Sequence, residues 1–169
     1  LTEVAAAAES QGAKAFAAGV HRQMAVVDAM MGKGRDIEAQ LAAADALTGK
    51  DTPGSYAWSA LAYASAAQLD RADAALDQLE TSAGDDAGLQ SVVRTGRAMV
   101  LLSRNQADQA LTALGEPDGD MSRAVSAECM KKLKRKDDAT KMKAAVLDEP
   151  AFSFYDAIRP FAVVKASKT

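Results

Sequence analysis

Residues 53–79 place the strongest constraint on the fold, because they carry two helical apolar stripes with a short break between them. Tyr56, Ala60 and Tyr63 recur at i, i+4 and i+7, which places them on one side of a helix. A second stripe with the same spacing consists of Leu69, Ala72, Leu76 and Leu79. The small side chains of Ala60 and Ala72 let two backbones approach closely. The stretch therefore predicts two helices folded back on each other.

Composition extends this expectation to the whole chain. Of 169 residues, 49% are hydrophobic but only 5% are aromatic, and alanine supplies much of the apolar content. Such a chain has high helix propensity and little bulk to pack, which suits closely packed helices. The β-branched residues never form the alternating runs typical of strands. We therefore expect an all-α protein.

Loop signals divide the chain into similar segments. Glycine, proline and polar residues gather at 31–34, 48–54, 82–88 and 115–120. The predicted helix pairs accordingly cover about residues 20–52, 53–86, 87–118 and 119–150. The remaining segment, 151–169, contains four of the eight aromatic residues: Phe152, Phe154, Tyr155 and Phe161. We expect it to cap the last pair; a role in a ligand site is the alternative.

The pair at 53–79 resembles a tetratricopeptide repeat, and its neighbours resemble variants of the same unit. Small residues that match at the start of the second helices are Ala39, Ala72, Ala110 and Ala139, separated by 33, 38 and 29 residues around the family's period of about 34. Those in the first helices are Ala60, Ala98 and Ala127; Tyr63 stands at the aromatic position, and Gly34 matches the glycine before the second helix. The resemblance implies one domain over residues 1–169: a right-handed solenoid of about four antiparallel helix pairs plus a C-terminal capping helix. Another all-α stack or bundle is the alternative.

In this family the first helices line a concave groove that accepts a peptide. The groove positions carried onto this chain are Met24, Asp28, Met31, Leu61, Met99, Leu102, Met121, Glu128 and Lys131. His21, Ala57, Ala64, Thr95 and Ala124 occupy adjoining positions. The resemblance implies an adaptable, methionine-rich surface. The alternative is that the methionines fill the core.

Basic residues concentrate in one short segment. Between Lys131 and Lys143 there are seven basic residues and two acidic ones, whereas the rest of the chain has 13 basic and 21 acidic residues. The densest part is a basic patch of Lys131, Lys132, Lys134, Arg135 and Lys136. This patch predicts attraction to an acidic partner. The alternative is a solvated helix end, where lysines favourably face the negative end of the helix dipole.

Residues suited to catalysis or metal binding are sparse. His21 is the only histidine and Cys129 the only cysteine, so neither a histidine cluster nor a Cys–His metal motif is available. The acidic pairs at 85–86 and 137–138 fall in loop-like segments and are typical of helix caps. We expect no catalytic site, no metal and no cofactor. No apolar run approaches the ~18 residues that a transmembrane helix requires.

These observations favour a protein–protein interaction or scaffold module that holds a partner peptide or domain. The alternative is self-association, as a homodimer, or a spacer role within a larger protein. The net charge of −3 and a pI near 5.2 argue against a nucleic-acid partner. The alanine-rich composition suggests a bacterial source, and the ending looks similar to exported repeat proteins, with a cytoplasmic location as the alternative. We interpret the start at Leu1 as a fragment or a processed product.

Overall fold

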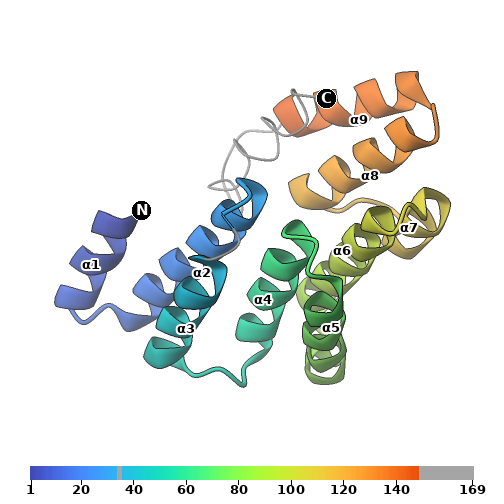
Figure 1. Ribbon diagram of the computed structural model, residues 1–169. Coiled ribbons are helices and arrows are strands. Elements are labelled where there is room, and N and C mark those ends of the chain that lie inside the picture. The colour runs from blue at the N-terminus through green and yellow to red at the C-terminus, as the bar shows by residue number, and fades with distance from the viewer. Residues whose placement is uncertain (34–35, 149–169) are drawn as a thin grey trace. The chain divides into compact units, whose positions relative to one another are not determined.

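The computed structural model describes residues 1–33 and 36–148, which form nine helices and no strand (Figure 1). The helices are α1 (Thr2–Ser10), α2 (Lys14–Met30), α3 (Asp36–Thr48), α4 (Pro53–Ser65), α5 (Leu69–Ala83), α6 (Ala87–Ser103), α7 (Ala107–Leu114), α8 (Asp120–Lys132) and α9 (Lys136–Asp148). The prediction of an all-α protein is confirmed for this part of the chain. The predicted capping segment, 151–169, lies outside the described residues.

Local sequence sets where the helices begin. The Thr52 hydroxyl accepts a hydrogen bond from the backbone N–H of Ser55 at 3.1 Å, so Thr52 caps α4. Pro53 occupies the first turn of α4, where its missing N–H costs nothing. Asp86 caps α6 in the same way, because its carboxylate accepts from the N–H of Leu89 at 2.9 Å. The breaks predicted at 48–54 and 82–88 therefore coincide with the starts of α4 and α6.

One tight turn recurs five times among the described residues. In each turn a residue with positive φ lies two positions after the last residue of the helix, and the N–H of the residue after it bonds to the carbonyl five residues back, as in a Schellman motif. The positive-φ residues are Gly12, Gly32, Ala67, Asn105 and Lys134. Their turns join α1 to α2, α2 to α3, α4 to α5, α6 to α7 and α8 to α9. The successive helices therefore fold back on each other.

Each of these turns also sets the inner face of the helix that follows. The residue five positions after the positive-φ residue is buried in every case, with at most 5% of its surface exposed. These five residues are Ala17, Ile37, Ala72, Ala110 and Ala139. The prediction was wrong for the first pair, because Ala39 is exposed and Ile37 takes its place. Gly32 is the positive-φ residue of this turn, and the predicted Gly34 lies outside the described residues.

The chain divides into two compact units, Leu1–Gln90 and Ser91–Thr169, with the boundary inside α6. In unit 1, α2 packs against α1, α3 and α4, and α4 packs against α5. Fully buried side chains of this unit include Val26, Ile37, Leu76 and Leu79. The core of unit 1 is therefore formed where these helices meet.

A polar network ties three helices of unit 1 together. Arg22 of α2, only 9% exposed, donates to the Thr48 hydroxyl of α3 at 2.9 Å and lies 3.6 Å from the Asp45 carboxylate. The Ser55 hydroxyl of α4 donates to the same carboxylate at 2.7 Å. Burying a guanidinium is costly unless it is paired. The network thus holds α2, α3 and α4 in one arrangement.

Unit 2 is built around residues from α6, α7 and α8. Its buried cluster consists of Ala98, Ala107, Ala110, Leu114, Val125 and Cys129. Met99, Leu101, Leu102, Leu111 and Leu133 pack against this cluster while remaining partly exposed. Beyond it, α8 packs against α9 as well as α7. The core of unit 2 is thus formed mainly by alanine and other small or aliphatic side chains, with longer aliphatic side chains around it and no aromatic residue among them.

Candidate functional site

The predicted groove residues of unit 1 lie mainly along α2. Met24 and Asp28 are partly exposed, and Met31, just after the helix, is 55% exposed. Their spacing of four and seven residues places them on one side of the helix. Burial raises the pKa of Asp28, with Asp36 adding to the effect and Lys33 opposing it. Leu61 of α4 differs, because it is 3% exposed and belongs to the core.

The predicted groove residues of unit 2 lie on α6 and α8. Met99 and Leu102 of α6 pack against the buried cluster of the unit and keep part of their surface exposed. On α8, Met121, Glu128 and Lys131 are also partly exposed. Met99 and Leu102 therefore combine core packing with accessible apolar surface.

The adjoining positions are mostly buried. Ala57, Ala64 and Thr95 are each at most 7% exposed, whereas His21 and Ala124 are partly exposed. On α4, the positions that the resemblance assigned to a groove thus lie inside the protein, together with Leu61. Short side chains on this helix are covered by its neighbours, so the accessible candidates are the longer residues of α2, α6 and α8.

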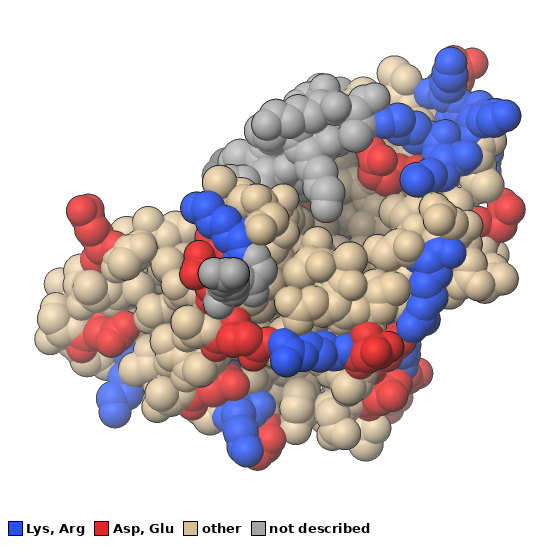
Figure 2. All heavy atoms as spheres, in the orientation of Figure 1, with Lys and Arg blue, Asp and Glu red and all other residues tan. Residues whose placement is uncertain are grey.

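The basic patch surrounds the turn between α8 and α9. Lys131 and Lys132 are in the last turn of α8, Lys134 is the positive-φ residue of the turn, and Arg135 and Lys136 lead into α9. Lys131 is partly exposed, and the other four residues of the patch are exposed. Figure 2 shows the basic side chains gathered at this end of the two helices. The chain thus presents a concentrated positive surface here.

Helix-dipole stabilisation accounts for only part of this patch. Lys131 and Lys132 favourably face the C-terminal end of α8. Lys134, however, has a φ of 63°, a conformation that disfavours a lysine, and Lys136 opens α9, where the dipole disfavours positive charge. Arg135 pairs with Asp138 at 3.0 Å, but the four lysines of the patch form no ion pair within the described residues.

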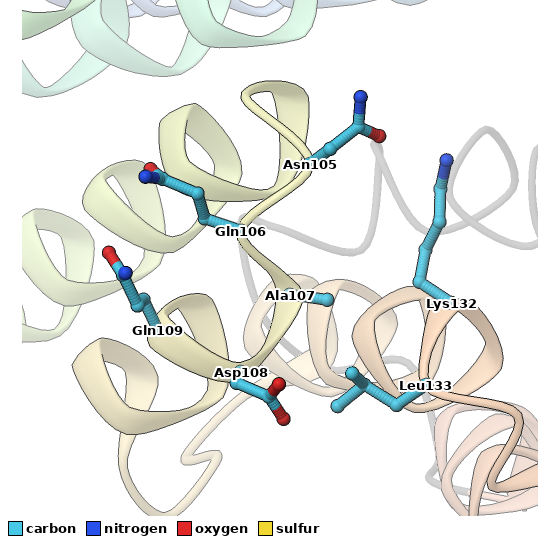
Figure 3. A pocket seen from close by; sticks show the side chains of 7 residues that line it. All are labelled: Asn105, Gln106, Ala107, Asp108, Gln109, Lys132 and Leu133. Carbon is cyan, nitrogen blue, oxygen red and sulfur yellow. The ribbon is translucent and has the colours of Figure 1, made fainter.

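An open hollow lies beside the basic patch, within unit 2. Its volume is about 480 Å³, and Lys132 and Leu133 form one wall. The α6–α7 turn and the first turn of α7 supply the rest: Asn105, Gln106, Ala107, Asp108 and Gln109 (Figure 3). Gln106 precedes α7 but makes no side-chain cap hydrogen bond. Sequence reasoning missed this hollow, because its two walls are more than twenty residues apart in the chain.

A second hollow, of about 340 Å³, lies between α1 and α2 in unit 1. Its lining is largely apolar: Glu3, Val4, Ala7, Ala8, Gln11, Ala13 and Phe16. Val4 and Phe16 are 45% and 55% exposed, and nearby in the chain Leu1 is 53% exposed. These three are large apolar side chains in contact with solvent. This end of unit 1 therefore has an apolar surface that the described residues leave uncovered.

Reactive groups are few in the described part of the chain. No three His, Cys, Asp or Glu side chains gather there in a way that could hold a metal ion. Cys129 is buried, and its burial, together with the nearby charge of Glu128, raises the pKa of the thiol to about 11. The thiol is therefore protonated and unreactive near neutral pH. Over the same residues, none of the helices combines the length and the apolar character that crossing a membrane requires.

Comparisons of the chain with models of protein families, with curated proteins and with solved structures find no match.

Proposed function

We propose that the chain is a tetratricopeptide-like repeat protein, a right-handed solenoid that binds another protein. The support comes from the pairs α2–α3, α4–α5, α6–α7 and α8–α9, which share one turn and one buried position. Their turns are 35, 38 and 29 residues apart, around the period of about 34 typical of these repeats. The packing of α2 against α4 also fits, since first helices of consecutive repeats lie side by side in such a stack.

The basic patch with its four lysines outside any ion pair of the described residues is the observation that carries a binding function. Positive charge held at this density repels itself and gains stability when an acidic partner arrives. Two of the lysines occupy positions where helix geometry disfavours them, so their placement is better explained by a ligand than by folding. The partner is an acidic segment of another protein, drawn to the patch by long-range attraction.

The neighbouring hollow supplies short-range contacts for such a segment. The side-chain amides of Asn105, Gln106 and Gln109 can donate to and accept from a peptide backbone, and Leu133 offers apolar surface. Lys132 lines the hollow and belongs to the patch as well. A bound segment could thus place an acidic side chain on the patch and its backbone in the hollow.

Charge reversal tests this proposal with a matched control. Lys132→Glu, Lys134→Glu and Lys136→Glu together should abolish capture of the partner, whereas Lys14→Glu, Lys33→Glu and Lys50→Glu, also at exposed lysines, should not. Both triple variants change the net charge equally. Capture is measured by pull-down from the source organism and then by titration with the captured protein, at two salt concentrations, since the attraction weakens with salt. Equal loss in both variants, or capture of nucleic acid instead, would contradict the proposal.

The methionine surface is tested separately. Met31→Glu and Met121→Glu place a charge on side chains that are at least partly exposed and lie outside the buried cluster. If a groove along the first helices also binds the partner, these variants reduce affinity while the circular dichroism spectrum stays unchanged. Unchanged affinity removes the groove and leaves the basic patch as the binding surface.

Self-association is a second candidate function, and the apolar surface near α1 favours it. Leu1, Val4 and Phe16 expose large apolar side chains that a second copy would cover. Light scattering over a range of concentrations tests this candidate. A dimer that Phe16→Ser disrupts would support it, and a monomer at every concentration would rule it out.

A further inference from the structure

The single histidine of the chain connects three helices of unit 1. His21 lies on α2, and its Nε2 is 2.9 Å from Oε1 of Glu9 on α1. Its Nδ1 is 2.7 Å from Oε1 of Gln40 on α3. The His21 side chain is 15% exposed and that of Glu9 is 45% exposed. The imidazole therefore bridges the terminal helix α1 to the rest of the unit.

Both partners of the imidazole are hydrogen-bond acceptors as they are placed. A carboxylate oxygen and an amide oxygen each require an N–H donor, and only the doubly protonated imidazolium has two. A neutral ring has one N–H, so it loses one of the bonds or requires the Gln40 amide to turn over. The geometry thus matches the charged form of His21.

The electrostatic surroundings act in the same direction. Burial by itself lowers the pKa of His21, but the hydrogen bonds to Gln40 and Glu9 and the negative charge of Glu9 raise it, and the net shift is upward from 6.5. From the other side, α4 presents no charged residue, and its Tyr56 and Tyr63 hydroxyls bond to Asp51 and Glu38. The remaining charged groups on α2 and α3 have other neighbours. Lys14 is exposed, Arg22 lies near Asp45, and Glu38 pairs with Arg71. The two acidic residues Asp28 and Asp36 influence each other.

Apolar contacts hold α1 only weakly. Its buried residues are Ala5 and Ala8, which contribute one methyl group each, and Val4 remains 45% exposed. Because hydrophobic stabilisation scales with the apolar area buried, this helix gains less than one anchored by leucines. A charge-assisted hydrogen bond is therefore a large share of what keeps α1 in place.

We propose that α1 is a pH-controlled helix, docked on α2 while His21 is protonated and released when His21 becomes neutral. Release would uncover the surface of α2 against which α1 packs. The switch lies within unit 1 alone and does not depend on the partner surface proposed above.

The direction of the pH effect follows from the shift. Since the folded-state pKa of His21 is raised, its contribution to docking is fully present below the unfolded value of about 6.5 and is lost as pH rises through the folded value. Docking of α1 is thus strongest below the unfolded pKa of His21 and weakens as pH rises through the folded one.

Glu9→Gln is the decisive variant, because glutamine keeps the size and the acceptor oxygen but removes the charge. As the chain has one histidine, its ring-proton NMR signal is unambiguous and gives the pKa directly. We expect titration above 6.5 in the unmodified chain and a lower value in Glu9→Gln. Amide exchange in α1 should be several-fold faster in Glu9→Gln than in the unmodified chain at about pH 5.5, and equal at about pH 8. Amides of α5 serve as the internal reference.

Gln40→Glu is the converse variant. A second carboxylate beside the ring should raise the His21 pKa further and extend the slow exchange of α1 to higher pH. Titration of His21 at or below 6.5 in the unmodified chain would overturn the proposal. So would equal exchange of α1 in the unmodified and Glu9→Gln proteins at about pH 5.5.

Discussion

At the scale of single residues, Ile37 fills with a branched side chain a position that alanine occupies after the other four turns. It is fully buried, whereas Ala39, two residues later, is exposed. The turn at Gly32 determines this difference, because the fifth residue after the positive-φ residue is buried in all five turns. In this turn the position thus accommodates a larger buried side chain than alanine.

Ile37→Ala should destabilise the protein by about 2–4 kcal/mol, since it removes buried methyl and methylene groups and leaves a cavity. Urea unfolding followed by circular dichroism measures the loss. Ala39→Ser, the matched control on the exposed side of α3, should change stability by no more than about 0.5 kcal/mol. A larger loss of stability in Ala39→Ser than in Ile37→Ala would instead support the buried position that the repeat alignment gave to Ala39.

At the scale of elements, three of the five turns place a residue other than glycine at positive φ. These residues are Ala67, Asn105 and Lys134, with φ of 57°, 61° and 63°. Left-handed backbone disfavours residues with a Cβ atom, and asparagine tolerates it better than alanine or lysine. The turns therefore retain strain that the packing of the flanking helices must offset.

Ala67→Gly should stabilise the protein by about 0.5–1 kcal/mol, because relief of the left-handed strain exceeds the added entropy of the unfolded chain. Asn105→Gly should increase the stability by less, because asparagine tolerates left-handed backbone better than alanine. The control is Ala66→Gly, at a neighbouring residue with φ of −86°, which should destabilise because there is no strain to relieve. Denaturant midpoints compare the three. A loss of stability in Ala67→Gly would contradict this account of the turn.

The loop before α8 is tied to α6 by Asp118. Its carboxylate accepts from the Ser91 hydroxyl at 2.6 Å and from the Arg94 guanidinium at 2.9 Å. The hydrogen bond from Ser91 lowers the pKa of Asp118 most, and Arg94 lowers it further, against a smaller opposing effect of burial. Ionised Asp118 thus stabilises unit 2.

Asp118→Asn should reduce stability near neutral pH. Since the folded-state pKa is lowered, the contribution is present above the unfolded value of about 3.9 and is lost as pH falls through the folded value. Thermal melts of both proteins at about pH 7 and about pH 3 should therefore differ at the higher pH and converge towards the lower one. A constant difference at all pH values would mean that the charge of Asp118 plays no part.

At the scale of the whole molecule, stability is divided among local contacts. Within the two units, the most extensive helix contacts join consecutive helices, namely α2 with α3, α4 with α5 and α8 with α9. In unit 2 the cluster around Leu114 joins α6, α7 and α8. A cavity in this cluster should consequently reduce the local stability of those three helices most.

Leu114→Ala should cost about 2–4 kcal/mol, because this side chain is 2% exposed at the centre of the cluster. Hydrogen exchange should accelerate more in α7 and α8 than in α2 and α3. Leu76→Ala, at a fully buried leucine of unit 1, should show the opposite pattern. Uniform acceleration across all helices in both variants would instead mean that the chain unfolds as one cooperative body.

The sequence by itself determined that the described chain is helical and where most helices begin. Apolar spacing at i, i+4 and i+7 and the pair Thr52–Pro53 are local signals, and local hydrogen bonding and side-chain spacing are enough to express them. The turns were harder to predict, because Ala67 and Lys134 are not turn-forming residues and match no local rule. The repeat alignment placed Ala39 at the buried position of the first pair and did not identify Gly32 as the turn residue, although Ile37 is the buried residue there.

Tertiary structure alone decided which residues are buried and which distant ones meet. Leu61 and Met99 carry similar apolar side chains in the sequence, yet one is in the core and the other remains partly exposed. The contacts of His21 with Glu9 and Gln40, and of Lys132 with the α6–α7 turn, join residues that no periodicity relates. Helix formation depends on neighbours in the chain, whereas these contacts depend on how the helices pack, and packing follows from the sum of many side chains.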